Sequence, residues 1–297
     1  MERTYRLSAE EDDRLDRYVC ARYPELSRSR VQRLIADGNI TVNGRQAKPA
    51  QRLTPGDTID ITVPPAPPQE LKPEAIPLKI IYEDDDLLVV DKPAGLTVHP
   101  APGHPGHTLV NAILAHFPHL ADIGDSLRPG VVHRLDKDTS GVMLMAKNGD
   151  AQANLSKQFK GHTVTKAYRA LVKGRLEPEE GLIEADIGRD PKNRKKMAVV
   201  AEGREARTEY RVIKYLGNHT LLEVRPETGR THQIRVHLAA IGFPVVGDKV
   251  YGVKSKHLDR QFLHAFLLGF KLPSSGEYVE FQSDLPEDLK KALEAIG

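Results

Sequence analysis

The apolar residues in the first part of the chain recur at helical and then at strand spacing. Up to a helix stop at Gly38, apolar side chains return every three or four positions. This repeat predicts two short helices, built on Leu15, Val19 and Tyr23 and on Val31, Leu34 and Ile35. Residues 40–42, the turn signal Asn43-Gly44 and the alternating residues 58–63 then predict short strands. The first unit should therefore contain two helices followed by a small sheet.

Residues 64–77 interrupt this pattern with six prolines in fourteen positions. Proline fixes φ and removes a backbone donor, so this segment cannot continue a helix or a central strand. An extended, semi-rigid spacer is expected there. The predicted division is a small domain with its linker, residues 1–75, and a larger domain, residues 76–297.

Short apolar runs dominate the pattern after the linker. Strands are predicted at residues 87–90, 142–146, 166–172 and 219–224. Helices are predicted at residues 108–116, 150–160 and 231–240. Glycine and proline lie between these elements, which favours an α+β domain with a mixed, largely antiparallel sheet and flanking helices.

The composition excludes several classes of protein. The chain of 297 residues has one cysteine, Cys20, so no intrachain disulfide and no multi-cysteine zinc site are expected. No uninterrupted apolar run approaches the roughly 20 residues of a membrane span. A cytoplasmic protein that does not enter the membrane is the resulting expectation.

The charges are segregated along the chain, although the net charge is only +2. Residues 28–52 carry +5, residues 154–175 carry +6 and residues 189–196 carry +4, while residues 70–91 and 277–297 are acidic. Any one such run is more often a solvated surface. Three basic segments with few or no acids together favour a nucleic-acid surface.

Polar chemistry is concentrated in residues 131–141, which precede the predicted strand 142–146. A carboxylate in a loop that enters a buried strand can be dry, which makes Asp136 a candidate nucleophile or base. For Asp138 a charged turn is the favoured interpretation.

Two further segments carry candidate residues. In residues 227–238, Arg235 lies beside apolar neighbours and needs a carboxylate such as a buried aspartate, whereas His232 and His237 are more often structural histidines. In residues 166–170, Tyr168 could stack on a base or lie in the core.

The run His133-Arg134-Leu135-Asp136 with Thr139-Ser140-Gly141 resembles the signature of the RluA family of RNA pseudouridine synthases. Residues 91–100, 166–168, 229–238 with 247–248 and 251–252, and 260–265 resemble that family in the expected order. Residues 13–63 resemble the S4 RNA-binding domain. This pairing of domains is most similar to the RluD type, which acts on large-subunit ribosomal RNA.

The resemblance implies roles for individual residues. Asp136 would attack a flipped-out uridine, detach uracil from ribose and allow reattachment through carbon 5. Tyr168 would pack on the uracil and take part in removing the C5 proton, Arg235 would pair with Asp136, and Arg134 would help displace the base. The other candidates for contact with substrate or RNA are His133, Thr139, Arg230, Arg28, Arg30, Arg33 and Lys48. No metal or organic cofactor is implied, and a monomer bound to large-subunit ribosomal RNA is expected.

Two alternative functions remain open from the residues alone. A non-catalytic RNA-binding or ribosome-assembly protein would need only the S4-like unit. A Mg²⁺-dependent aspartyl phosphohydrolase would fit Asp136-Lys137-Asp138-Thr139, with Asp248 as a later acid. Against the second alternative, His133 and Arg134 stand where that class places buried strand residues.

Overall fold

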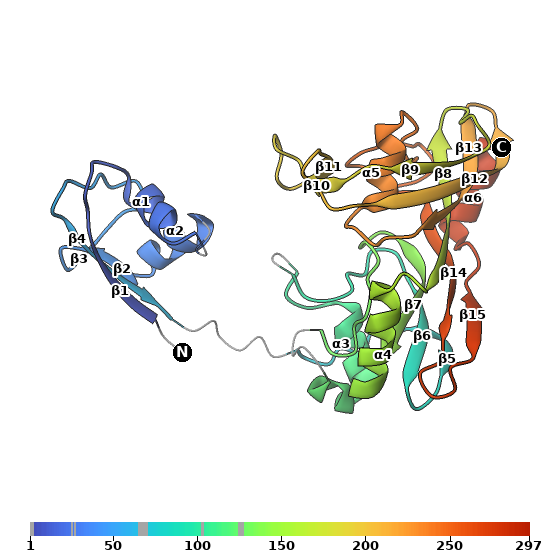
Figure 1. Ribbon diagram of the computed structural model, residues 1–297, viewed down its shortest axis with the longest axis horizontal. Coiled ribbons are helices and arrows are strands. Elements are labelled where there is room, and N and C mark those ends of the chain that lie inside the picture. Colours follow the sequence, from blue (N-terminus) through green and yellow to red (C-terminus); the bar gives the residue numbers. More distant parts are fainter. Residues whose placement is uncertain (1–2, 25, 27, 65–70, 102–103, 124–127) are drawn as a thin grey trace. The chain divides into compact units, whose positions relative to one another are not determined.

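The computed structural model describes residues 3–24, 26, 28–64, 71–101, 104–123 and 128–297. The chain forms two compact units, residues 1–69 and 70–297 (Figure 1). Most of the first half of the proline-rich segment, residues 65–70, lies outside the described residues. The domain limit at residues 75 and 76 stays a prediction.

The first unit packs two helices on a small antiparallel sheet. Its elements are β1 Arg3–Ser8, α1 Leu15–Arg22, α2 Arg28–Ala36, β2 Ile40–Val42, β3 Arg45–Gln46 and β4 Thr58–Val63. The strands lie in the order β1-β4-β2-β3. Both helices turn their apolar repeats inward, and Leu15, Val19, Val31 and Ile35 are completely buried. The two predicted helices are confirmed, whereas β1 was not predicted, because the strand that pairs with it, β4, is distant in sequence.

The second unit is built on one large sheet. Its strands are β5 Lys79–Glu83, β6 Leu87–Lys92, β7 Ser140–Ala146, β8 Thr165–Lys173, β9 Glu180–Glu184, β12 Arg207–Leu216, β13 His219–Pro226, β14 Leu263–Lys271 and β15 Tyr278–Gln282. They lie in the order β5-β6-β7-β14-β8-β13-β12-β9, with β15 paired to β14. Only β7 and β14 pair in parallel among the strands described. The predicted α+β class with a mixed, largely antiparallel sheet is confirmed.

Helices cover this sheet where its strands are apolar. They are α3 Leu109–His116, the short 3₁₀ helix η1 Pro118–Asp122, α4 Gly149–Lys160, α5 Gln233–Ala240 and α6 Glu287–Ile296. Alternate residues of β6 and β7 face opposite ways, so Leu88 and Met143 pack with α3 whereas Leu87 and Leu144 pack with α4. Helices α5 and α6 share a core with β8, β12 and β13 (Figure 1). A separate hairpin, β10 Ile187–Arg189 and β11 Met197–Val199, encloses the basic residues 189–196.

The second half of the proline-rich segment is attached to the second unit. Leu71, Ile76 and Leu78 pack against the apolar cluster that contains α3. The Asn111 side chain donates to the Lys72 carbonyl at 2.8 Å. The expected spacer therefore does not extend through residue 77, because the apolar side chains between the prolines find a surface to cover.

One predicted helix begins later than expected. The sequence pattern predicts a helix from residue 231, but α5 starts at Gln233, since His232 has φ 58° and ψ 18° in the left-handed region. The amphipathic helix α6 and the strands β5, β9 to β12, β14 and β15 were also not predicted. In the described part of the chain, each helix is too short or too polar to span a bilayer.

Candidate active site

A cavity of about 500 Å³ lies in the second unit between the loop before β7, the strand β8 and the start of α5. Seven of the residues predicted from the sequence line it. They are His133, Arg134, Asp136, Thr139, Tyr168, Arg230 and Arg235. These residues come from segments up to about a hundred positions apart, so the fold brings the predicted catalytic motifs to one place.

Asp136 is presented by a turn that is held by one internal backbone hydrogen bond and by two cationic side chains. The Thr139 amide donates to the Asp136 carbonyl at 3.1 Å. Lys92 is completely buried and donates to the Lys137 carbonyl at 3.0 Å, while Arg260 donates to the Asp138 carbonyl at 3.0 Å. Burial lowers the pKa of Lys92 to about 7, against the opposing charges of Asp138 and Asp136. The backbone that carries Asp136 is thus held on both sides of the turn.

The exit from this turn requires glycine. Gly141 has φ 120°, and a Cβ atom there would lie 2.0 Å from the Ala265 carbonyl oxygen. At this point β7 and β14 begin their parallel pairing, with Ala265 opposite Gly141. The close approach of the two strands sets where Asp136 enters the cavity.

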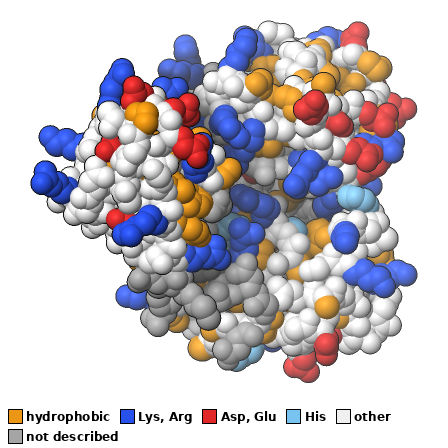
Figure 2. Space-filling model, turned by 60° about the vertical axis from the view of Figure 1, so that its left-hand side comes forward, with side chains coloured by type: hydrophobic (Ala, Val, Ile, Leu, Met, Phe, Trp, Pro, Cys, Tyr) orange, Lys and Arg blue, Asp and Glu red, His pale blue; other side chains and the backbone are white. Residues whose placement is uncertain are grey.

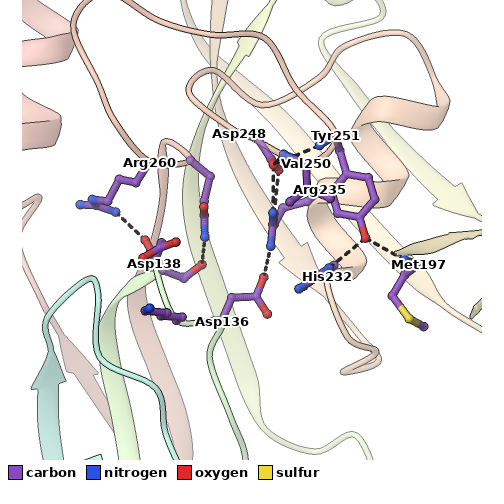
Figure 3. A network of polar contacts seen from close by, with 12 residues as sticks. Asp136, Asp138, Met197, His232, Arg235, Asp248, Val250, Tyr251 and Arg260 are labelled. Carbon is purple, nitrogen blue, oxygen red and sulfur yellow. Dashed lines mark hydrogen bonds and ion pairs between the residues drawn. The ribbon is translucent and has the colours of Figure 1, made fainter. Parts of the chain in front are cut away.

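Arg235 links two carboxylates (Figure 3). Its Nη1 donates to Asp136 at 2.9 Å, and its Nε and Nη2 donate to Asp248 at 2.7 and 2.9 Å. Burial alone would lower the pKa of Arg235, but the hydrogen bonds and charges of Asp248 and Asp136 raise it. The predicted contact between Arg235 and Asp136 is confirmed, and the guanidinium stays charged.

Asp248 is the member of this group that the sequence reasoning did not include as a site residue. Its side chain is completely buried and also accepts the amides of Val250 and Tyr251 at 2.8 and 3.1 Å. Burial would raise the pKa of Asp248, but hydrogen bonds from Arg235 lower it. The guanidinium group of arginine has five N–H donors and can bind two carboxylates, so a second acidic partner of Arg235 could have been expected from the sequence.

Tyr168 lies on the face of β8 that is turned toward the cavity. Burial and the charge of Asp136 raise the pKa of Tyr168 far above its usual value, so the phenol keeps its proton. Lys166, on the same face, donates to the Glu227 carbonyl at 3.0 Å, and burial lowers its pKa to about 8. A protonated phenol and a partly shielded amine therefore border the cavity beside Asp136.

The other predicted residues that line the cavity differ in their exposure and in the hydrogen bonds that their side chains make within the protein. Arg134 is exposed, whereas Arg230 donates to the Glu205 carbonyl at 2.9 Å. Thr139 is buried and accepts from Gln261 at 3.3 Å.

The side chain of His133 is also held by contacts within the protein. Its Nε2 accepts the Leu144 amide at 2.9 Å, and its ring stacks on Phe159 with 4.5 Å between centroids. Burial lowers the pKa of His133 to about 3, with a further contribution from the charge of Lys166, so the ring is neutral. Of the residues compared, Arg134 has the most freedom to meet a ligand.

The predicted RNA-binding residues of the first unit do not line this cavity. They are Arg28, Arg30 and Arg33 on α2 and Lys48 in the loop after β3. Arg28 donates through Nε and Nη2 to the buried Asp16 at 3.0 and 2.9 Å, so it also ties α2 to α1. Arg33 and Lys48 are exposed.

The cavity has a surplus of positive charge. Its lining includes Arg134, Lys160, Lys166, Arg230 and Arg235, with Asp136 as the acid. Lys and Arg side chains gather round a hollow on the face shown in Figure 2. This arrangement suits one reactive carboxylate and a ligand that carries negative charge. Among the described residues, no three side chains of His, Cys, Asp or Glu form a possible metal site.

Both units of the chain match families of known proteins. Residues 86–240 match the family described as RNA pseudouridylate synthase, and residues 13–59 match the S4 domain. The chain is 52% identical to a protein of Chloroflexus aurantiacus named uncharacterized RNA pseudouridine synthase, over 96% of this chain and 90% of that protein.

Two further relatives extend the comparison. The chain is 44% identical to the ribosomal large subunit pseudouridine synthase D of Zymomonas mobilis, over 93% of this chain and 92% of that protein. Among solved structures, human RNA pseudouridylate synthase domain containing 1 has a TM-score of 0.58 and 32% identity, and the match covers 72% of this chain and 85% of the human one.

These findings decide between the functions left open by the sequence. The family match covers the catalytic motifs and not the S4 domain alone, which argues against a solely RNA-binding protein. The phosphohydrolase alternative needs Asp248 as a metal ligand, but that carboxylate is occupied by Arg235 and two backbone amides. With the predicted aspartate, tyrosine and arginine around one cavity and these relatives along almost its whole length, the chain belongs to the RNA pseudouridylate synthase family.

Proposed function

We propose that this enzyme converts uridine to pseudouridine in large-subunit ribosomal RNA, with Asp136 as the nucleophile. The observation that carries the proposal is the Asp136 carboxylate, held at 2.9 Å by Arg235 inside a basic cavity. The large-subunit substrate is supported by the similarity to the Zymomonas mobilis protein of that name. The isomerisation itself follows from membership of the family.

Asp136 is oriented for attack by the contacts around it. Arg235 holds Oδ2 while the turn fixes the backbone, so the carboxylate meets a nucleotide at a defined angle. A new bond forms between a carboxylate oxygen and a carbon of the nucleotide, and the bond between N1 and C1′ breaks. The uracil then turns and C5 bonds to C1′, while the bond to the Asp136 oxygen breaks and restores the free carboxylate. Overall one proton leaves C5 and one arrives at N1.

Tyr168 is suited to a later step than the attack. Burial and the negative charge of Asp136 both raise the pKa of its phenol in the free enzyme. When Asp136 forms a covalent bond, its negative charge disappears and one of these two effects is removed. Tyr168 is then more acidic, so its phenol can pass its proton to the detached uracil, and the phenoxide can take the C5 proton after C5 has bonded to C1′. Before that stage the ring provides a surface for the uracil.

The basic surfaces bind and open the RNA. Flipping the base out of the RNA costs a few kcal/mol of lost stacking. Arg134, which is exposed at the cavity, takes the place of the displaced base. Arg28, Arg30, Arg33 and Lys48 of the S4 domain contact phosphates. We further propose that the enzyme acts as a monomer in the cytoplasm.

The decisive experiment replaces Asp136 by asparagine. We expect the single-turnover rate of pseudouridine formation to fall by at least about a thousandfold, because the amide cannot attack. The substrate is large-subunit ribosomal RNA from cells that lack the protein, and pseudouridine is mapped along it. RNA affinity should change little.

Asp138→Asn is the matched control, two positions along the same turn. Its side chain is not assigned to the reaction, so its rate should stay within a few fold of the wild type. Full activity of Asp136→Asn would contradict the proposed mechanism, while pseudouridine in small-subunit RNA alone would contradict the proposed substrate.

A further inference from the structure

His232 occupies a backbone conformation that a residue with a side chain seldom adopts. It has φ 58° and ψ 18°, directly before the first residue of α5, and its side chain lines the cavity. No capping hydrogen bond from this side chain to the described helix accompanies the conformation. Left-handed backbone at a residue other than glycine is concentrated at functional sites.

The Nδ1 atom of the His232 imidazole is hydrogen-bonded to Tyr251. The Met197 amide donates to the Tyr251 hydroxyl oxygen at 2.8 Å, and that oxygen lies 2.9 Å from His232 Nδ1. The phenol has one hydrogen to give, and Nδ1 is the acceptor within reach. When the phenol donates to Nδ1, the imidazole hydrogen lies on Nε2. Burial lowers the pKa of His232, which favours the neutral ring that this arrangement requires.

The free end of the imidazole is directed at the reactive carboxylate. Figure 3 shows the ring extending from Tyr251 toward Asp136. Within the described residues, no partner is found for Nε2. The charged groups around the ring are Asp136, Arg235, Asp248 and Arg134. A fixed N–H donor therefore stands beside the nucleophile, in the space that a flipped nucleotide would fill.

We propose that His232 is a substrate-binding residue, which donates a hydrogen bond from Nε2 to an oxygen of the flipped nucleotide. Tyr251 is its positioning residue, because the phenol selects the tautomer that leaves the hydrogen on Nε2. This inference rests on the proposed function. The contribution is orientation, since the donor fixes the nucleotide relative to the Asp136 carboxylate.

Tyr251 also connects this donor to the hairpin β10–β11. Met197 is the first residue of β11 and follows the basic residues 189–196 directly. The Tyr251 ring lies 5.2 Å from the Arg235 guanidinium carbon. Thus one tyrosine contacts the hairpin, the histidine and the arginine that holds Asp136.

The test compares His232→Gln with His232→Asn. The amide nitrogen of glutamine reaches about as far as Nε2, whereas that of asparagine reaches only as far as Nδ1. We expect His232→Gln to keep the single-turnover rate within about fivefold of the wild type and His232→Asn to lose about a hundredfold, with little change in RNA affinity. A role limited to the turn predicts the reverse order, because asparagine tolerates the left-handed region better than glutamine. A His232→Asn rate equal to that of the wild type, or above that of His232→Gln, overturns the proposal.

A double-mutant cycle tests the role assigned to Tyr251. Tyr251→Phe should slow the single-turnover rate about tenfold when His232 is present, because the imidazole then loses both the hydrogen bond that orients it and the preference for a hydrogen on Nε2. The same change should cost less than about twofold in the His232→Gln background, since an amide has no tautomer to select. Equal losses in both backgrounds would show that Tyr251 does not act through His232.

The wild-type enzyme and Asp136→Asn in the same reactions distinguish the two levels of failure. A wild type that makes no pseudouridine in large-subunit RNA overturns the proposed function and this inference with it. An active wild type with an unaffected His232→Asn variant overturns the His232 assignment alone. Thermal unfolding of each variant confirms that the compared proteins are folded.

Discussion

The two units each contain a buried ionic cluster, and the clusters have opposite composition. In the first unit one buried anion, Asp16, accepts hydrogen bonds from Arg14, Arg28 and Gln32. In the second unit one buried cation, Arg235, serves two carboxylates, Asp136 and Asp248. The same pairing of guanidinium and carboxylate thus appears once with surplus donors and once with surplus acceptors.

The two ionic clusters differ in which of their side chains are exposed. The side chain of Asp16 is 0% exposed, while its partners Arg14 and Arg28 are 41% and 54% exposed. Arg235 is 6% exposed, and of its partners only Asp136, at 17%, reaches the cavity. A buried anion with partly exposed cations joins two helices and leaves the arginine side chains open to a ligand. A buried cation with one partly exposed anion leaves a carboxylate open to the cavity.

Removing the central cation should have the largest effect on stability. Arg235→Met leaves Asp248 buried without its main partner, so we expect the free energy of unfolding to fall by about 3–5 kcal/mol and activity to be lost. Urea titration followed by circular dichroism measures the loss. Adding Asp248→Asn to this variant should restore part of it, since the uncompensated charge is then removed.

The matched change in the first unit is Arg14→Met. Asp16 would keep Arg28 and Gln32, so the expected cost is below about 1 kcal/mol. A cost as large as that of Arg235→Met would show that the two clusters are not as different as their exposure indicates.

Acid should weaken the first cluster by an intermediate amount. Burial would raise the pKa of Asp16, but hydrogen bonds from Arg14, Gln32 and Arg28 lower it to about 2. A lowered pKa contributes stability above the unfolded value and loses it as the pH falls toward about 2. We therefore expect the free energy of unfolding of the wild type to exceed that of Asp16→Asn by about 2 kcal/mol at pH 7. Urea titrations at a series of pH values should show this difference becoming smaller below about pH 4. A gap that is unchanged at pH 2.5 would refute this account of Asp16.

The smallest effect on stability is expected for Arg28→Ala. Its side chain is more than half exposed and Asp16 keeps two other partners, so the cost should stay below about 1 kcal/mol. RNA affinity should nevertheless fall, and the slope of log affinity against log salt should become shallower by about one. Arg17→Ala, an exposed arginine on α1, is the control. Equal salt slopes for both variants would argue against an RNA contact at Arg28.

The local pattern predicted much of the fold and part of the site. The apolar repeats located α1, α2, α3 and α4 and four strands of the large sheet, because each repeat covers consecutive residues. The need of a buried arginine for a carboxylate predicted that Arg235 would pair with a buried aspartate, and the family resemblance implied that this partner is Asp136. The structure shows that contact at 2.9 Å. Strand β1 escaped prediction, since the strand that pairs with it, β4, lies far away in sequence.

The sequence by itself determined which chemical groups this protein has available: basic segments, a candidate aspartate with an arginine to pair with it, and a tyrosine on a strand. Tertiary structure decided which groups share a site, because the order of strands β7, β14 and β8 brings residues far apart in sequence together. It alone showed Asp248 on the second side of Arg235, and His232 held by Tyr251 with its free nitrogen toward Asp136. Hydrogen-bond partners of this kind depend on angles and distances between segments, and no local pattern along the chain encodes them.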